Sequence, residues 1–527
     1  MEVLLTPKPQ YKFDLYKKRF EEFIASERFL PIFGVLVLFF HLLGRDMLGV
    51  TFIFAYLTVV FLSDADIRAT LPVFAMLIFT ASLEQGFYRV GSSNPIVYIE
   101  NIPFLIILLS LSAVGITVGL IRRYKYRISS FSWMSNAHFP QQENYTGDTL
   151  PPVSSDSKIK KETLSAQKNL RTLKTSWGLI GVIAMGLSFI LGGLFSGGYN
   201  IMAFVMGLVF AVMFIGFFLV GKLTTKKIDF DYLAKVLILM SLVAVIQLLI
   251  VYIYRDIFST SANDGGNYAK YEIAVGWGHS NSIAVIIALG LPFSLYFMAT
   301  HEKPYWAFGV FAVQVLAVIL CLSRAMTFLI IPVAILGLAY SIYRQRKKTR
   351  LFLIIATGAT VVIALVVFLV QMENILSALA FYIEAGLDDN DRFAIYRQAW
   401  QAFIRNPIFG AGLVYDTPYL NFSDFLFMAH NSFLQFLAWG GIIGFSAFIF
   451  HLVVTTIALF KKPNEKRMIL FVVALLVIGN SMLEVFLFMP PTLIIYMLVI
   501  GAIDNDAIEQ DGFGRIEIKK QKEMVVN

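Results

Sequence analysis

The residues best suited to chemistry lie where apolar runs begin. The stretch FMAHNSFLQFLAWGGIIG starts at Phe427 and places His430 and Asn431 directly before a long apolar run. An unperturbed histidine titrates near pH ~6.5, so it can act as a general base at neutral pH. The alternative is structural, with His430 as a boundary residue that caps the following helix. The residues themselves leave both interpretations open.

Arginine is the second candidate, because its planar fork of donors suits phosphate. Arg324 interrupts an apolar stretch from Tyr305 to Tyr343, which is about twice the length of one membrane span. We therefore predict a tight hairpin at Arg324. A charge within such a stretch is a functional hypothesis by default, although an arginine at a hairpin tip can also extend toward lipid headgroups.

A third group lies on a predicted helix with the sequence DRFAIYRQAWQAFIRNP. At about 100° per residue, Arg392 and Arg397 flank an apolar stripe about 100° wide, and Arg405 points away from it. Pro407 and two glycines end the helix. The alternative is a helix that lies on the membrane with its arginines reaching lipid phosphates. The stripe consists of Phe393, Tyr396, Trp400, Phe403 and Ile404.

Other polar motifs favour structural roles or carry little signal. His279, in GWGHSNSIA, precedes residues typical of a helix start, so we interpret it as structural or substrate-contacting. Asp64 and Asp66 form a DAD motif, which we interpret as a solvated turn beside Arg68. The DDND motif at 388–391 lacks the partners and spacing of a calcium loop. We expect no metal and no cofactor.

Membrane helices must position these residues. Hydrophobic residues make up 58% of the 527 and charged residues 15%, an apolar excess that a soluble domain of this size could not bury. We predict an all-α, polytopic membrane helical bundle of about 12–14 transmembrane helices with one large folded external loop. Apolar runs lie at 29–43, 48–63, 69–84, 103–121, 177–195, 199–221, 234–254, 281–299, 305–322, 325–343, 351–370, 432–460, 468–485 and 488–503.

The dense basic clusters predict the orientation of the bundle. With an even number of spans they all fall on one side, which the positive-inside rule assigns to the cytoplasm. Examples are RRYKYR, RQRKKTR and KKPNEKR. This accounts for the net charge of +8 without nucleic acid, because no basic stretch is interleaved with aromatic residues in a stacking pattern.

This orientation divides the chain into seven predicted segments. They are a cytoplasmic amphipathic segment at 1–28, N-terminal transmembrane helices at 29–121, a cytoplasmic disordered loop at 122–176, central transmembrane helices at 177–370, an external catalytic loop at 371–431, C-terminal transmembrane helices at 432–503 and a cytoplasmic tail at 504–527.

The order of these motifs resembles that of the O-antigen ligase/polymerase superfamily. A hairpin-tip SRA is followed by DRFAIYRQAWQAFIRNPIFGAGLVY and then by AHNSFLQFLAWGGIIG, and GHSNSIA also fits. The resemblance covers roughly residues 275–445. It implies a multi-pass protein of the bacterial cell (inner) membrane that transfers glycans from undecaprenyl diphosphate without a metal. The family's functional arginines fall on Arg324 and Arg392, and its loop histidine falls on His430.

The chemistry of these residues agrees with that resemblance. His430 could take the proton of an acceptor hydroxyl while Arg324 and Arg392 stabilise charge on the leaving diphosphate. Tyr396 and Tyr415 could stack on sugar rings, whereas Trp400 is expected to pack in the core. The remaining predicted substrate-binding residues are Arg397, Asn431, His279 and Asn281.

Three functions stay open at this stage. The first is polymerisation of lipid-linked oligosaccharide repeat units. A composition rich in Lys, Ile and Phe suggests a low-GC, Gram-positive source, and such a source favours this function. The second is ligase-type transfer of a finished glycan to a lipid or protein acceptor. The third, of another class, is a polysaccharide flippase. Expected partners are the lipid-linked donor, an acceptor glycan, membrane lipids, and chain-length regulator and flippase proteins.

Overall fold

The structure is a computed structural model, and it describes only part of the chain. The described residues are 9–42, 46–63, 65–73, 75, 111, 114–115, 118, 177–195, 201–224, 230–254, 273–275, 278–370, 392–412, 429–461 and 464–504. The chain divides into two compact units. The first comprises residues 1–25, 51–70 and 100–176, and the second comprises 26–50, 71–99 and 177–527.

The first unit contains α1 (Pro9–Ile24), most of α3 (Asp46–Leu62) and η1 (Ile67–Thr70). The Tyr56 hydroxyl of α3 donates a hydrogen bond to the Ala69 carbonyl at 2.9 Å, which fixes the turn that follows this helix. In that turn, Asp66 accepts a hydrogen bond from the Arg68 backbone N–H, as expected of a solvated turn. Asp64 lies outside the described residues.

The second unit carries the remaining elements and all the candidate site residues. Its described residues are helical apart from a small antiparallel pair, β1 (Ala274–Val275) and β2 (Gly278–His279), so the predicted all-α class is confirmed. Its helices are α2 (Phe29–Leu42), α8 (Trp177–Phe195), α9 (Ile201–Thr224), α10 (Phe230–Tyr254), α13 (Ser280–Thr300), α14 (Tyr305–Leu320), α15 (Arg324–Arg344), α16 (Lys347–Val370), α18 (Arg392–Arg405), α19 (Ser432–Lys461), α20 (Glu465–Ser481), η2 (Phe486–Phe488) and α21 (Pro490–Ile503).

Seven of the described helices are long and apolar enough to cross a membrane: α8, α9, α10, α13, α15, α16 and α19. Shorter apolar helices include α14 and α21. The predicted spans at 69–84 and 103–121 lie largely outside the described residues. The predicted hairpin at Arg324 is present, because α14 ends at Leu320 and α15 begins at Arg324.

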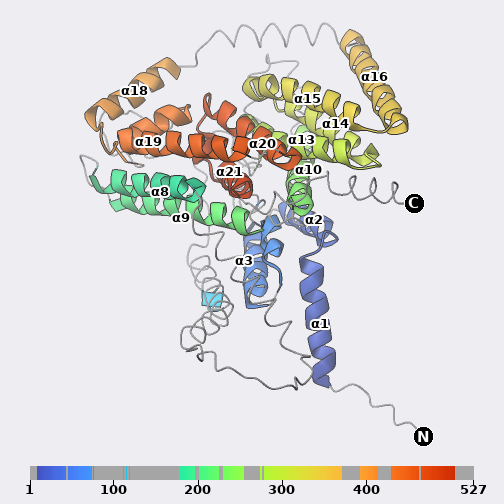
Figure 1. The fold of residues 1–527 in the computed structure, drawn as a ribbon, viewed down its shortest axis with the longest axis horizontal. Coiled ribbons are helices and arrows are strands. Elements are labelled where there is room, and N and C mark those ends of the chain that lie inside the picture. Colours follow the sequence, from blue (N-terminus) through green and yellow to red (C-terminus); the bar gives the residue numbers. More distant parts are fainter. Residues whose placement is uncertain are drawn as a thin grey trace, which may run out of the picture. The chain divides into compact units, whose positions relative to one another are not determined.

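Helix α13 is the most enclosed span and organises its neighbours α10, α14 and α15 (Figure 1). A chain of buried hydrogen bonds links three of them. Ser294 of α13 donates to Gln314 of α14 at 2.8 Å, and Gln314 donates to Ser241 of α10 at 3.0 Å. Such bonds, with small residues at the contact, stabilise helix association where no hydrophobic drive operates between spans.

Helices α8, α9, α19 and α21 lie together in the second unit (Figure 1). Glycines allow their backbones to pack closely. A Cβ on Gly221 of α9 would lie 2.2 Å from the Leu498 carbonyl oxygen of α21. A Cβ on Gly193 of α8 would lie 2.7 Å from the Phe204 Cα of α9. The backbones therefore approach more closely than any larger residue permits.

Ion pairs among the described helices of the second unit lie at two opposite ends. Arg344 pairs with Glu465, and Lys222 pairs with Asp504, where α15, α9 and α21 end and α20 begins. We call this the basic end. The start of α13, the start of α15 and the end of α20 lie together at the other end, which we call the polar end. The register supports this, because Ser341 near the C-terminus of α15 bonds to the Leu295 carbonyl of α13, so the two helices run parallel.

Candidate active site

The start of α19 fixes the position of His430. Asn431 caps this helix, because its Oδ1 accepts hydrogen bonds from the backbone N–H groups of Phe433 at 2.9 Å and Leu434 at 3.1 Å. Asn431 Nδ2 also donates to the Met482 carbonyl at 2.9 Å. The cap is thus Asn431, and His430 stands just before it with a positive φ of 46°. A non-glycine residue held in this region is strained, which is a pointer to function.

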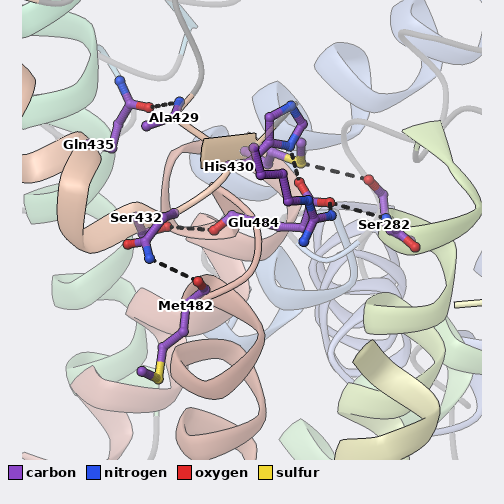
Figure 2. Close-up of polar contacts among 11 residues, drawn as sticks. Ser282, Ala429, His430, Ser432, Gln435, Met482 and Glu484 are labelled. Atoms are coloured by element: carbon purple, nitrogen blue, oxygen red, sulfur yellow. Dashed lines mark hydrogen bonds and ion pairs between the residues drawn. The ribbon is translucent and has the colours of Figure 1, made fainter. Parts of the chain in front are cut away.

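Glu484 brings the predicted residues together (Figure 2). It lies just beyond α20, and one of its carboxylate oxygens, Oε2, is 2.8 Å from His430 Nδ1. The other oxygen, Oε1, accepts from an Arg392 Nη at 3.2 Å and from Asn281 Nδ2 at 3.2 Å. One carboxylate therefore joins the starts of α13, α18 and α19.

The burial of Glu484 makes these contacts necessary. Its side chain is 10% exposed, while those of Arg392 and His430 are 31% and 40% exposed. A carboxylate removed from water is costly unless it is paired and hydrogen-bonded, and three donors meet that requirement here. The backbone of the same residue is also held, because Ser432 Oγ donates to its carbonyl at 3.2 Å.

This geometry defines what His430 can do. A neutral imidazole that donates its Nδ1–H to Glu484 keeps the lone pair on Nε2 available to accept a proton. The carboxylate then stabilises the imidazolium that forms. The pair has the arrangement of a general base with an orienting acid.

Tyr396 lies one helical turn from Arg392 on α18. Burial raises its pKa above the ordinary 10.0, the charge of Glu484 raises it further, and the charge of Arg392 lowers it. Its phenol therefore stays protonated at neutral pH and can donate a hydrogen bond.

Arg324 lies at the polar end, at the start of α15. Neighbouring Met326 is contacted by Asn480 of α20, whose Nδ2 lies 3.6 Å from the sulfur. Within the described part of the chain, one guanidinium nitrogen of Arg324 is buried without a hydrogen-bond partner. Side-chain oxygens of Ser280, Ser323, Asn480 and Ser481 are also buried without a hydrogen-bond partner among the described residues. These residues lie at the start of α13, at the start of α15 and at the end of α20. Buried polar atoms without partners are rare, so this group is suited to a polar ligand.

The other predicted residues are placed as follows. His279 is in β2, immediately before α13, and Asn281 contacts Glu484 directly. Arg397 is exposed on α18, and Tyr415 lies outside the described residues. The expectation that Trp400 packs in the core is wrong, because its side chain is 48% exposed. The predicted aromatic stripe on α18 is not buried along its whole width. Tyr396 is partly buried, whereas Trp400 is exposed.

Glu484 was not predicted from the sequence. It lies 54 residues after His430 along the chain, so no local motif connects them. A usable signal exists nevertheless. Glu484 is a lone acid in the apolar run SMLEVFLFMPP, and an ionisable residue among apolar ones at the end of a span marks a candidate site.

No group of three or more His, Cys, Asp or Glu side chains in the described ranges could hold a metal ion. The acidic motif at 388–391 lies outside those ranges, so it is not tested by this observation. The positive charge at the polar end is supplied by Arg392 and Arg324.

The long apolar helices of the described residues define the class as a multi-pass helical membrane protein. Residues 309–449 match the family model described as O-Antigen ligase, and this match supports the O-antigen ligase/polymerase superfamily for that segment of the chain. The segment contains Arg324, Arg392 and His430, whereas Glu484 and Asn281 lie outside it. No curated protein matches the chain. The family implies a membrane enzyme that transfers glycosyl groups.

Proposed function

We propose that this protein transfers a glycan from undecaprenyl diphosphate to an acceptor hydroxyl at the polar end of the bundle, which faces the outside of the cell membrane. The observation that carries this proposal is the Glu484 carboxylate, which holds His430 on one oxygen and Arg392 on the other. A base and a phosphate-binding cation are thereby set side by side at the end of several spans.

The proposed step balances as follows. The acceptor hydroxyl oxygen attacks the anomeric carbon of the donor, and the bond from that carbon to the diphosphate oxygen breaks. The lipid diphosphate leaves with the electron pair. His430 Nε2 takes the hydroxyl proton, and Glu484 stabilises the resulting imidazolium. Arg392 and Arg324 stabilise the negative charge that develops on the leaving group.

Arginine at the membrane surface suits this donor. A diphosphate anchored by a lipid tail is held at headgroup level, and the guanidinium fork binds phosphate oxygens with two parallel hydrogen bonds. Arg324 has a buried nitrogen without a partner among the described residues, and Arg392 retains donors beyond its contact with Glu484. The side-chain oxygens of Ser280, Ser323 and Ser481, which have no hydrogen-bond partner in the described part of the chain, suit the hydroxyl groups of a sugar.

Polymerisation of lipid-linked repeat units is the first choice within this reaction. Ligase-type transfer of a finished glycan to a lipid or protein uses the same donor and the same base. The two are separated by deleting the gene and sizing the surface glycan. A polymerase deletion leaves single repeat units, whereas a ligase deletion leaves long chains that are not attached to their acceptor.

Purified protein with a lipid-linked oligosaccharide donor tests the reaction itself. We expect release of lipid diphosphate and growth of the glycan, and we expect no effect of EDTA, because two arginines supply the charge that a metal ion would bring. Movement of donor across a vesicle membrane without bond cleavage would identify a flippase instead. Loss of transfer on chelation would point to a metal held by carboxylates.

A further inference from the structure

Helix α19 is broken at Gly441. The residue has φ 60° and ψ −158° inside an element that runs from Ser432 to Lys461. This conformation is essentially restricted to glycine. The break lies nine residues after Ser432, about 14 Å along the helix from its start. At that depth, the backbone groups freed by a break must find partners within the protein.

The segment that follows α18 supplies those partners. The N–H groups of Ile442 and Ile443 donate to the carbonyls of Pro407 at 2.8 Å and Ile408 at 3.3 Å. In return, the N–H groups of Ala411 and Gly412 donate to the carbonyls of Ala438 and Trp439, at 2.8 and 3.1 Å. Residues 407–412 are thus inserted into the break by four backbone hydrogen bonds. We call this contact the splice.

Glycine is required on both sides of the splice. A Cβ on Gly441 would lie 2.4 Å from the Ile408 carbonyl oxygen, and one on Gly410 would lie 2.3 Å from the Trp439 carbonyl carbon. Both clashes are with backbone, so no side-chain movement relieves them. Gly410 and Gly412 also have positive φ values, 76° and 82°. By contrast, a Cβ on Gly440 meets nothing closer than Ser188 Oγ at 3.7 Å.

The splice fixes one end of α18, and the Arg392 contact with Glu484 lies at the other end. Helix α18 has 14 residues and spans about 21 Å between them. Resting on the function proposed above, we propose that Gly441 and Gly410 are positioning residues. They lock the helix that carries Arg392 into the helix that carries His430, so that the cation and the base keep one spacing during transfer. A misplacement of about 1 Å in such a pair can lower the rate by about 10²-fold.

Hydrogen exchange on the purified full-length protein tests the splice directly. The first amides of a helix ordinarily exchange fast because they have no partner. We expect the amides of Ile442, Ile443, Ala411 and Gly412 to be protected in the wild-type protein. Fast exchange at these four amides would overturn the splice, whatever the protein's activity.

Gly441→Ala, compared with Gly440→Ala, tests the positioning role. We expect Gly441→Ala to lose protection at the splice and to lower kcat by about 10²-fold, while it binds lipid-linked donor with unchanged stoichiometry. Gly440→Ala should behave as wild type. A change that merely destabilises the protein would reduce the number of donor-binding sites in step with the rate. The positioning role instead predicts a lower kcat with the number of donor-binding sites unchanged.

Two outcomes overturn the proposal. One is a Gly441→Ala protein that transfers at the wild-type rate with an unprotected splice. The other is a Gly440→Ala protein that loses as much activity as Gly441→Ala. If Gly441→Ala does not insert into the membrane, Gly412→Ala replaces it, because it strains the splice and leaves the break in α19 untouched. Wild-type protein without any transfer, but with a protected splice, would contradict the proposed function and not the splice.

Discussion

At the scale of single residues, the Glu484 carboxylate determines how the candidate base behaves. It contacts His430 Nδ1 at 2.8 Å and an Arg392 Nη at 3.2 Å. The ring is thereby oriented with Nε2 free, and the proton it accepts is balanced by a nearby negative charge. The same carboxylate holds Arg392 beside the base.

Glu484→Gln should separate the charge of this residue from its shape. The amide keeps the size of the carboxylate but cannot stabilise an imidazolium, so we expect kcat to fall by about 10²-fold or more with donor binding retained. Steady-state rates of the purified protein measure this. Glu465→Gln, at the basic end, is the matched control and should stay close to wild type. A Glu484→Gln enzyme of normal kcat would remove the carboxylate from the account.

Arg392 and Arg324 should tolerate neither alanine nor lysine fully. We expect Arg→Ala at either position to abolish or severely reduce transfer in protein that still inserts, and Arg→Lys to restore only part of it, because an ammonium lacks the planar fork. Arg405→Ala, an exposed position at the end of α18, serves as the control. Full activity of both lysine variants would show that charge alone is needed, and full activity of the alanine variants would return both residues to lipid contact.

At the scale of elements, the Asn431 cap positions the histidine before it. Asn431→Ala removes both the cap and the bond to the Met482 carbonyl, so we expect a loss of about 1 kcal/mol in stability and lower transfer. Asn431→Asp keeps the capping oxygen and should retain most of the stability. Thermal unfolding of the two variants measures the difference. Equal unfolding of Asn431→Ala and wild type would contradict the role of the cap.

Elements defined by local signals were predictable from the sequence. The hairpin at Arg324, the helix ended by Pro407 and the helix start at Ser280 each follow from charge, proline or helix-entry residues within a few positions. The role of Glu484 was not predictable in the same way, because it depends on packing between α20 and α19. The break at Gly441 was also missed, since a pair of glycines in an apolar run does not show what fills the gap.

At the scale of the whole molecule, the mechanism depends on which side of the membrane the polar end faces. Basic clusters lie in the loops that the positive-inside rule assigns to the cytoplasm, so the N-terminus, the loop at 122–176 and the C-terminus are expected inside. Reporter fusions after residues 150 and 410 should then report opposite sides. If both report the same side, the orientation is wrong and the external reaction with it.

The most direct test of the central claim is transfer by purified His430→Ala with a lipid-linked oligosaccharide donor. We expect a loss of about 10²–10⁴-fold in rate with donor binding retained, because the arginines that bind the diphosphate are unchanged. A His430→Ala enzyme that transfers glycan at the wild-type rate would contradict the assignment of His430 as the base.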